Sequence, residues 1–232
     1  MNLKDKIVVI TGGSKGLGKV LASFLKKEGS NVIICAKNTK EVETTANELS
    51  VDFFVGDVTK EKDMQELADS AEQKFGKIDI WVNNAGLLYS FSPKDKYIDI
   101  EKAREMMDVN LFGTIFGSRS ALGKMQSNKD GTIINIISTA ALDASKAKNL
   151  KIYFASKWAS RGYTQAIEAQ YKEQGISVIA VYPGGIQTEL WRNHKPENID
   201  QFMKPEYVAE KIISNLKQET PEKELIIKRP IV

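Results

Sequence analysis

A tyrosine and a lysine four residues apart, Tyr153 and Lys157, are the side chains of this sequence best suited to move a proton together. Residues at this spacing share one face of a helix, so the phenol and the ammonium come within reach of each other. A free phenol titrates near pH ~10, and a neighbouring positive charge favours its ionised form. Lowering that pKa to about 7 requires roughly 4 kcal/mol, so the site needs a second cation besides one lysine. Taken alone, the same pair also fits an exposed amphipathic helix.

A glycine-rich segment near the N-terminus supplies a second motif. Residues 7–10 are apolar, residues 11–18 read Thr-Gly-Gly-Ser-Lys-Gly-Leu-Gly, and apolar side chains then recur at helical spacing. A strand, a glycine turn and a helix in this order form the setting in which the N–H groups of a helix N-terminus bind a pyrophosphate. Gly12 suits the tight turn, Gly16 a close approach of phosphate, and Gly18 close packing of the helix on the strand. A turn without a ligand is the alternative.

Apolar strand-like runs alternate with amphipathic helical segments along the whole chain. This alternation is typical of a parallel sheet covered by helices on both faces. We therefore predict an α/β fold, a Rossmann-like doubly wound parallel sheet of about seven strands in three α/β/α layers, as a single domain over residues 1–232. The expected strands are 5–11, 31–36, 51–56, 78–83, 131–138, 176–182 and 224–229, and the expected helices are 16–28, 39–49, 60–75, 98–126, 153–173 and 205–217.

The composition limits the classes of function. Acidic and basic residues are nearly balanced, with a net charge of +3, which gives no reason to expect a nucleic-acid-binding tail. One histidine, His194, and one cysteine, Cys35, provide no zinc constellation, so no metal is expected. Cys35 lies in an apolar strand and is interpreted as a buried filler, whereas His194 is interpreted as a surface residue. No apolar run reaches membrane-spanning length and no signal segment is found, so a cytoplasmic location is expected.

The spacing Thr-Gly-x-x-x-Gly-x-Gly, taken with Tyr-x-x-x-Lys, resembles the short-chain dehydrogenase/reductase family. The resemblance covers essentially the whole chain, because further marks follow in order: Asp57, residues 83–86, Asn110, Ser138, residues 183–184 and Thr188. Gly12, Asp57, Asn83, Ser138 and Pro183 all fall at the ends of expected strands. Ligands of open parallel sheets bind beyond the carboxyl ends of the strands, so these positions are expected to meet in one site.

The resemblance implies a catalytic set of four residues. Tyr153 is the expected general acid in carbonyl reduction and the base in alcohol oxidation. Ser138 is expected to hydrogen-bond the reacting oxygen, and Lys157 to lower the pKa of the tyrosine and to bind the nicotinamide ribose. Asn110 would hold a water that links Lys157 to solvent. A turn hydroxyl for Ser138 and a helix-kink residue for Asn110 are the structural alternatives.

The expected cofactor is NADP(H), in preference to NAD(H). An acid after the second strand commonly binds the ribose 2′-hydroxyl of NAD, but no acid stands at that place in residues 34–39. Lys37 and Lys15 would attract a 2′-phosphate, unless both are merely solvated. By resemblance, Asp57 contacts adenine and Thr188 orients the carboxamide, a role compatible with a helix N-cap. The implied cofactor-binding residues are Gly12, Ser14, Lys15, Gly16, Leu17, Gly18, Lys37, Asp57, Val58, Asn84, Ala85, Gly86, Tyr153, Lys157, Pro183, Gly184, Ile186 and Thr188.

The function implied is that of an oxidoreductase that interconverts a carbonyl and an alcohol by hydride transfer. A nucleotide-binding regulator or scaffold of the same fold, without turnover, is the alternative, because fold does not fix function. An epimerase of this fold would be expected to have a longer chain. The expected partner is a small-molecule carbonyl or alcohol, with no nucleic acid and no membrane. A homodimer or homotetramer is expected through the helices near 98–126 and 153–173.

Two segments depart from the pattern of many relatives and bear on the substrate. The stretch between Ser138 and Tyr153 is about two residues longer, a difference that a loop absorbs. The C-terminal strand lacks the glycine pair of fatty-acid-type 3-oxoacyl carrier-protein reductases, so the tail is more similar to sepiapterin-reductase-like and short carbonyl-reductase branches. A substrate lid is expected over residues 185–204. Candidate pocket residues, for which core or lid packing is an equal alternative, are Leu88, Tyr89, Phe91, Leu142, Trp191 and Phe202.

Overall fold

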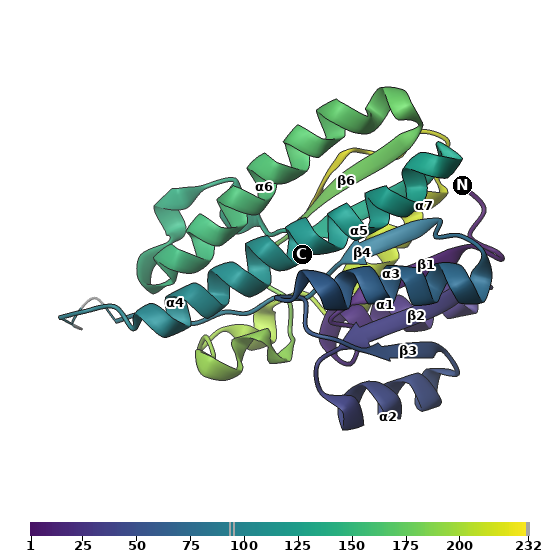
Figure 1. The fold of residues 1–232 in the computed structure, drawn as a ribbon. Helices are drawn as coiled ribbons and strands as arrows, with labels where there is room; N and C mark the ends of the chain where they lie inside the picture. Colours follow the sequence, from purple (N-terminus) through teal and green to yellow (C-terminus); the bar gives the residue numbers. More distant parts are fainter. Residues whose placement is uncertain (93, 95, 231–232) are drawn as a thin grey trace.

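The computed structural model of the protein describes residues 1–92, 94 and 96–230, whose strands form a seven-stranded sheet (Figure 1). Neighbouring strands pair in parallel throughout the sheet. The strands are β1 (Ile7–Thr11), β2 (Asn31–Ala36), β3 (Asp52–Val55), β4 (Ile80–Asn83), β5 (Gly131–Ile136), β6 (Ile176–Pro183) and β7 (Glu224–Ile227). Residues 231–232, which the predicted domain includes, lie outside the described residues.

The order of the strands creates a crevice at the centre of the sheet. The order is β3-β2-β1-β4-β5-β6-β7, so the chain first builds outward from β1 to β3 and then returns to the other side of β1 with β4. The loops that leave the carboxyl ends of β1 and β4 therefore diverge to opposite sides, and a ligand site is expected between them. The predicted Rossmann-like doubly wound class is confirmed.

Helices cover both faces of the sheet, because alternate residues of each strand point to opposite sides. Val8 and Ile10 pack in one buried cluster with α1, α2 and α7, whereas Val9 packs in another with α3, α5 and α6. Figure 1 shows α4 and α5 running alongside α6. The helices are α1 (Gly16–Lys27), α2 (Thr39–Leu49), α3 (Glu61–Phe75), α4 (Ile100–Met107), α5 (Gly113–Asn128), α6 (Lys151–Tyr171) and α7 (Pro205–Lys217).

The observed elements follow the predicted ranges, with two differences around the site. The helix expected over residues 98–126 is divided by a π-helical turn, η1 (Asp108–Phe112). The irregular stretch before α6 contains three short 3₁₀ turns, of which the first is η2 (Thr139–Ala141). The helix α6 begins at Lys151, two residues before the predicted start, and Tyr153 lies in its first turn.

The π-helical turn has a visible cause at Asn110. Its backbone carbonyl accepts hydrogen bonds from the hydroxyls of Thr114 and Ser160, both at 2.9 Å. Its side chain clamps the backbone of Leu87, accepting from the N–H at 2.8 Å and donating to the carbonyl at 2.9 Å. These contacts hold the turn in a wide conformation where a helix of regular pitch would otherwise continue.

Polar side chains beneath α5 and α6 are hydrogen-bonded to one another rather than left unpaired. Asn83 accepts from Trp81 Nε1 at 2.8 Å and donates to Ser118 Oγ at 2.9 Å and to Asn135 Oδ1 at 2.8 Å. Asn135 donates in turn to Thr164 Oγ1 at 2.9 Å. Buried polar groups that are satisfied in this way hold the ends of β4 and β5 in register with the two helices.

The close approach of α5 to this network depends on Gly117. A Cβ atom at that position would collide with Asn83 Oδ1 and lie 2.9 Å from Trp81 Nε1. We predict that Gly117→Ala lowers the free energy of unfolding by about 1–3 kcal/mol, because the core must shift to admit the methyl group. Urea denaturation followed by circular dichroism measures the change.

Gly123 provides a matched control on the same helix. A Cβ atom there would meet no described atom within 4 Å. Gly123→Ala should therefore raise the free energy of unfolding by about 0.5–1 kcal/mol, since alanine favours the helix. Equal effects of the two substitutions would contradict the packing described around Asn83.

Candidate active site

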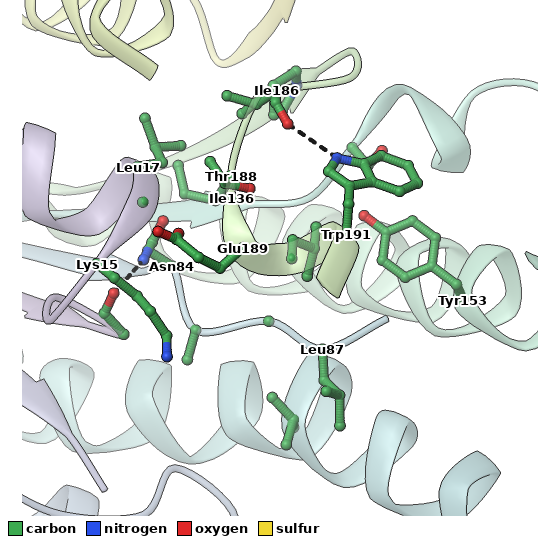
Figure 2. A pocket seen from close by; sticks show the side chains of 18 of the residues that line it. Lys15, Leu17, Asn84, Leu87, Ile136, Tyr153, Ile186, Thr188, Glu189 and Trp191 are labelled. Atoms are coloured by element: carbon green, nitrogen blue, oxygen red, sulfur yellow. Dashed lines mark hydrogen bonds between the residues drawn. The ribbon is translucent and has the colours of Figure 1, made fainter. Parts of the chain in front are cut away.

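A cleft of about 660 Å³ opens at the carboxyl ends of the central strands (Figure 2). Figure 2 shows Lys15 and Asn84 toward one end of it and Tyr153 and Trp191 near each other toward the other. The structure places most of the predicted site residues on its wall: Gly12, Ser14, Lys15, Gly16, Leu17, Lys37, Asp57, Val58, Asn84, Ala85, Gly86, Ser138, Tyr153, Lys157, Pro183, Gly184, Ile186 and Thr188. Gly18 and Asn110 lie behind that wall and support it through the contacts described for each.

The glycine turn after β1 is built by close backbone contacts. Gly12 has φ +63°, and a Cβ atom there would lie 2.8 Å from the Cα of Ala85. The amide of Asn84 donates to the carbonyls of Thr11 and Gly12, both at 3.0 Å, and so ties the turn to the end of β4. Gly16 also has a positive φ, +53°. Both glycines adopt the left-handed conformation that residues with side chains disfavour.

The start of α1 is shaped to receive an anion. A Cβ atom on Gly18 would collide with the carbonyl oxygen of Gly12, so only glycine allows the helix to begin this close to the turn. Lys15 occupies the N-cap, and among the described residues its side chain makes no capping hydrogen bond. The first N–H groups of α1 therefore remain for a ligand, and a pyrophosphate fits them in charge and geometry.

The end of β2 carries both positive and negative charge. Lys37 and Asn38 line the cleft there, as does Glu41 in the first turn of α2. The carboxylate of Glu41 lies 3.1 Å from the ammonium of Lys15. Glu41 was not predicted from the sequence, because it does not stand directly after the strand but in the helix that follows. An acid one helical turn after the N-cap Asn38 is the signal that could have revealed it.

The loop after β3 is ordered by its own side chains. Asp57 Oδ1 accepts from both the N–H and the hydroxyl of Thr59, at 3.0 and 2.9 Å. The N–H of Asp57 donates to Asp63 Oδ2 at 2.8 Å. Asp57 and Val58 thus form a fixed wall at the part of the cleft that lies beyond β2 and β3.

The phenol of Tyr153 is almost fully enclosed, with 6% of the residue exposed. Burial raises the pKa of Tyr153 to about 12, and the nearby hydroxyl of Ser138 opposes that rise. Ser138 follows β5 and accepts from the N–H of Ala140 at 3.1 Å, so the start of η2 fixes its hydroxyl. The two hydroxyl groups expected to contact one reacting oxygen therefore lie together in the structure.

Lys157 lies beneath the tyrosine and is also buried, with 5% exposed. Its Nζ donates to the carbonyl of Ile136 at 3.2 Å and lies 5.8 Å from the centre of the Tyr153 ring. Burial lowers the pKa of Lys157 to about 8, so the ammonium form still predominates at neutral pH. In the protein alone burial is the larger influence on Tyr153 and its pKa is raised, and the lowering expected from Lys157 stays a prediction.

Asn110 and Ser156 join the first turn of α6 to its surroundings. Ser156, which the sequence analysis missed, donates to the Tyr153 carbonyl at 2.7 Å and accepts from Asn110 Nδ2 at 3.0 Å. The side chain of Asn110 thus braces the first turn of α6 and the segment after Gly86 at the same time. Its expected role as a water ligand stays a prediction.

The segment after β6 closes the cleft from one side. Trp191 and Phe202 line the cleft as predicted, and their rings pack edge to face with centres 5.3 Å apart. Trp191 also donates to the carbonyl of Ile186 at 2.9 Å. Of the other pocket candidates, Leu88, Tyr89 and Phe91 pack in the apolar cluster beside Tyr153, and Leu142 packs in a separate cluster. Their described contacts support the packing alternative.

Three further residues can be placed at this end of the molecule. Glu189 lines the cleft and was not predicted from the sequence; its carboxylate approaches the Gly16 turn. Thr188 stands at the N-cap of the 3₁₀ turn η6 (Glu189–Asn193), but in the described part of the chain its hydroxyl makes no capping bond. His194 is exposed, as expected of a surface residue.

No group of three or more histidine, cysteine, aspartate or glutamate side chains is arranged to hold a metal ion within residues 1–92, 94 and 96–230. Over the same residues, no helix combines the length and apolar character needed to cross a membrane.

Comparison with known proteins gives a consistent result. A family model described as short chain dehydrogenase matches residues 6–199. An uncharacterized oxidoreductase of Staphylococcus aureus (strain MRSA252) is 33% identical over 219 residues, which are 93% of each chain. Another, from Staphylococcus saprophyticus, is 33% identical over 196 residues, 82% of each chain.

Solved structures resemble the fold over nearly its whole length. An alcohol dehydrogenase from the archaeon Thermococcus sibiricus, complexed with 5-hydroxy-NADP, superposes with a TM-score of 0.85 at 26% identity and covers 99% of this chain and 100% of its own. A short-chain dehydrogenase from Streptomyces avermitilis gives the same TM-score at 21% identity, over 98% of this chain and 89% of its own.

The buried ammonium of Lys157 should reduce the stability of the fold, and Lys157→Met tests this. At pH 7 we predict that the substitution raises the free energy of unfolding by up to about 3 kcal/mol, because the pKa of Lys157 falls from 10.5 to about 8 on burial. Thermal and urea denaturation measure the difference between the variant and the natural chain.

The pH dependence of that difference is the internal control. Below pH 8 the folded and unfolded chains both carry the charge, and the folded state bears the whole cost of burying it. Between pH 8 and 10.5 the folded chain releases the proton first, so the natural protein gains stability and the advantage of the variant shrinks. An advantage that is absent at pH 7, or unchanged at pH 10.5, would be inconsistent with a buried ammonium.

Proposed function

This chain belongs to the short-chain dehydrogenase family, and we propose that it is an NADP(H)-dependent oxidoreductase that interconverts a carbonyl and an alcohol. The observation that carries the proposal is the single cleft that joins the glycine turn at one end to Tyr153, Lys157 and Ser138 at the other. A nucleotide-binding regulator needs only the first end. A proton donor, a hydroxyl partner and a buried cation together serve chemistry on an oxygen atom.

Each residue at the reacting end has a role that follows from its surroundings. A nicotinamide cofactor, when bound, supplies or accepts the hydride. The hydroxyl of Tyr153 gives its proton to the carbonyl oxygen in reduction, and its phenolate form accepts the proton of the alcohol in oxidation. Ser138 donates a second hydrogen bond to the same oxygen and stabilises the negative charge that develops on it. Apolar side chains around Tyr153 exclude water and strengthen both interactions.

Lys157 supplies the positive charge that this chain places near the phenol. Because burial raises the pKa of Tyr153 to about 12, the phenolate needs more than one favourable interaction to form near neutrality. The ammonium of Lys157 contributes one, the hydroxyl of Ser138 a second, and the remainder must come from charge that enters with the ligands. We infer that Tyr153 transfers a proton near neutral pH only when a charged ligand occupies the cleft.

The charges beside β2 favour a phosphorylated ribose, with one opposing contribution. Lys37 and Lys15 are both on the wall of the cleft, and no acid directly follows the strand at residues 37–38. Glu41 offsets part of the attraction through its contact with Lys15. A 2′-phosphate arriving there would compete with Glu41 for Lys15 and would meet Lys37 directly. On balance we propose NADP(H), with a preference that Glu41 moderates.

The segment after β6 bears on the substrate. We propose that residues 185–204 act as a substrate lid, since Leu190, Trp191 and Phe202 from this segment cover the reacting end. The substrate is then a small molecule with apolar surface beside its carbonyl. A homodimer or homotetramer built on α4, α5 and α6, a single domain and a cytoplasmic location also remain proposals.

The proposal predicts that Tyr153→Phe abolishes most turnover while leaving cofactor binding intact. We expect kcat to fall by about 10²–10⁴-fold, the usual contribution of a general acid or base. NADPH consumption with a panel of ketones, aldehydes and quinones measures the rate, and NADPH fluorescence measures binding. Tyr163→Phe is the matched control, because Tyr163 lies on the same helix with its hydroxyl 3.5 Å from the carbonyl of Ile115. Tight NADPH binding without any turnover of the natural protein would favour the regulator.

Two substitutions with opposite expected effects on NADPH binding test the choice of cofactor. Lys37→Glu should weaken NADPH binding by roughly tenfold or more and affect NADH much less, since it replaces attraction to a phosphate by repulsion. Glu41→Gln should strengthen NADPH binding by about two- to fivefold, because it frees Lys15 from an exposed ion pair. Fluorescence titration with both nucleotides measures the ratio. Equal changes for NADH and NADPH would refute the assignment of a 2′-phosphate to this place.

A further inference from the structure

Arg161 is a half-buried cation of α6 that the proposed chemistry does not use. It follows Tyr153 and Lys157 at a spacing of four residues, so the three side chains form one stripe along the helix. Its Nη1 donates to the backbone carbonyl of Ala141 at 3.1 Å. Its guanidinium carbon lies 5.8 Å from the ring centre of Trp158 and 5.7 Å from that of Tyr182, so two aromatic rings flank it.

The other side of the guanidinium meets an acidic group that is already engaged. Glu224 Oε1 accepts from the hydroxyl of Tyr182 at 3.0 Å and from Gln165 at 2.9 Å. Arg161 Nε lies 3.9 Å from the same oxygen, beyond hydrogen-bond distance, and is buried with no acceptor among the described residues. A buried donor without an acceptor is destabilising, so the contacts of the guanidinium with Ala141 and the two rings must offset this cost.

Ala141 connects this arginine to the reacting end of the cleft. It closes the short turn η2, in which the N–H of Ala141 donates to the carbonyl of Ser138 at 3.0 Å. The N–H of Ala140 donates to the hydroxyl of the same serine at 3.1 Å. Ala141 is completely buried and packs against Tyr182. The turn is therefore one small unit, and a displacement of Ala141 displaces the Ser138 hydroxyl with it.

We propose that Arg161 is a positioning residue that holds the Thr139–Ala141 turn so that the Ser138 hydroxyl faces Tyr153. The inference rests on the proposed function, in which these two hydroxyls bind one oxygen atom. Tyr153 and Arg161 belong to the same helix, so α6 carries the proton donor and also fixes its hydrogen-bonding partner. The spacing between the two hydroxyls is then set by one rigid element rather than by the long loop that separates them in sequence.

The chemistry of arginine fits this task better than that of other cations. A planar guanidinium donates a directed hydrogen bond from its edge while its faces pack against aromatic rings. The rings of Trp158 and Tyr182 restrict its rotation, so the donor is held toward Ala141. A lysine would reach the same carbonyl with a less directed donor.

The first test compares kcat with cofactor affinity in Arg161→Met, which keeps the aliphatic stem and removes the donors. We expect kcat for carbonyl reduction to fall by about 10- to 100-fold, as for small displacements of a catalytic group. The dissociation constant for NADPH should stay within about twofold, because the glycine turn lies elsewhere in the cleft. Arg161→Lys should recover much of the loss. Arg119→Met, an exposed arginine of α5 paired with Glu61, is the control for loss of a cation.

A double-substitution cycle with Ser138→Ala separates positioning from general destabilisation. If Arg161 acts through Ser138, the double variant should be no slower than Ser138→Ala alone. The proposal is overturned if kcat of the double variant lies below that of Ser138→Ala by the same factor that Arg161→Met alone produces. It is also overturned if NADPH binding weakens in parallel with kcat.

Hydrogen–deuterium exchange gives a readout that does not depend on turnover. Arg161→Met should accelerate exchange of the Ala141 and Leu142 amides, which bond within the turn, but not of amides in the Gly12–Gly16 turn. Unchanged exchange at Ala141 and Leu142 would overturn the inference. If the natural protein reduces no carbonyl but Arg161→Met still accelerates this exchange, the proposed function is wrong. The inference that Arg161 holds the Thr139–Ala141 turn would then still stand.

Discussion

The burial of a phenol beside an ammonium is the constraint on which the site depends. The same desolvation moves the two groups in opposite directions, raising the pKa of Tyr153 to about 12 and lowering that of Lys157 to about 8. At neutral pH Lys157 is still mainly protonated, although its pKa lies only about one unit higher, and Tyr153 is fully protonated. Under the proposed function, such a pair transfers a proton only after further charge enters the cleft with the ligands.

The fold delivers these groups through contacts that are short and specific. Reversal of strand order between β1 and β4 opens the cleft, and the amide of Asn84 then ties the glycine turn to the end of β4. On the other side of the cleft, Asn110 joins the segment after Gly86 to the first turn of α6. The glycine turn and the helix that carries Tyr153 are therefore connected by hydrogen bonds of two asparagine side chains, both of which stabilise backbone conformation.

Residue patterns predicted the parts of this arrangement that follow from periodicity and spacing. Apolar alternation located the strands and helices, and the glycine and Tyr-x-x-x-Lys spacings led to the residues that line the cleft. What depends on contacts between distant segments could not be read in this way. Glu41 reaches Lys15 only because α2 folds back toward the glycine turn, and the π-helical turn at Asn110 arises from bonds to Leu87 and Ser160. The net effect of burial on Tyr153 likewise needs the complete surroundings of its hydroxyl, not its nearest cation alone.

The ionisation of Tyr153 is the most direct test of this account. Tyrosine labelled with ¹³C at Cζ reports phenolate formation by NMR, with Tyr153→Phe identifying the resonance. We expect that Tyr153 in the protein alone does not ionise below pH ~10, the usual value for a free phenol, and that it ionises at lower pH after addition of NADP⁺. A Tyr153 that ionises near pH ~7 without any nucleotide would contradict it, because Lys157 alone would then outweigh burial.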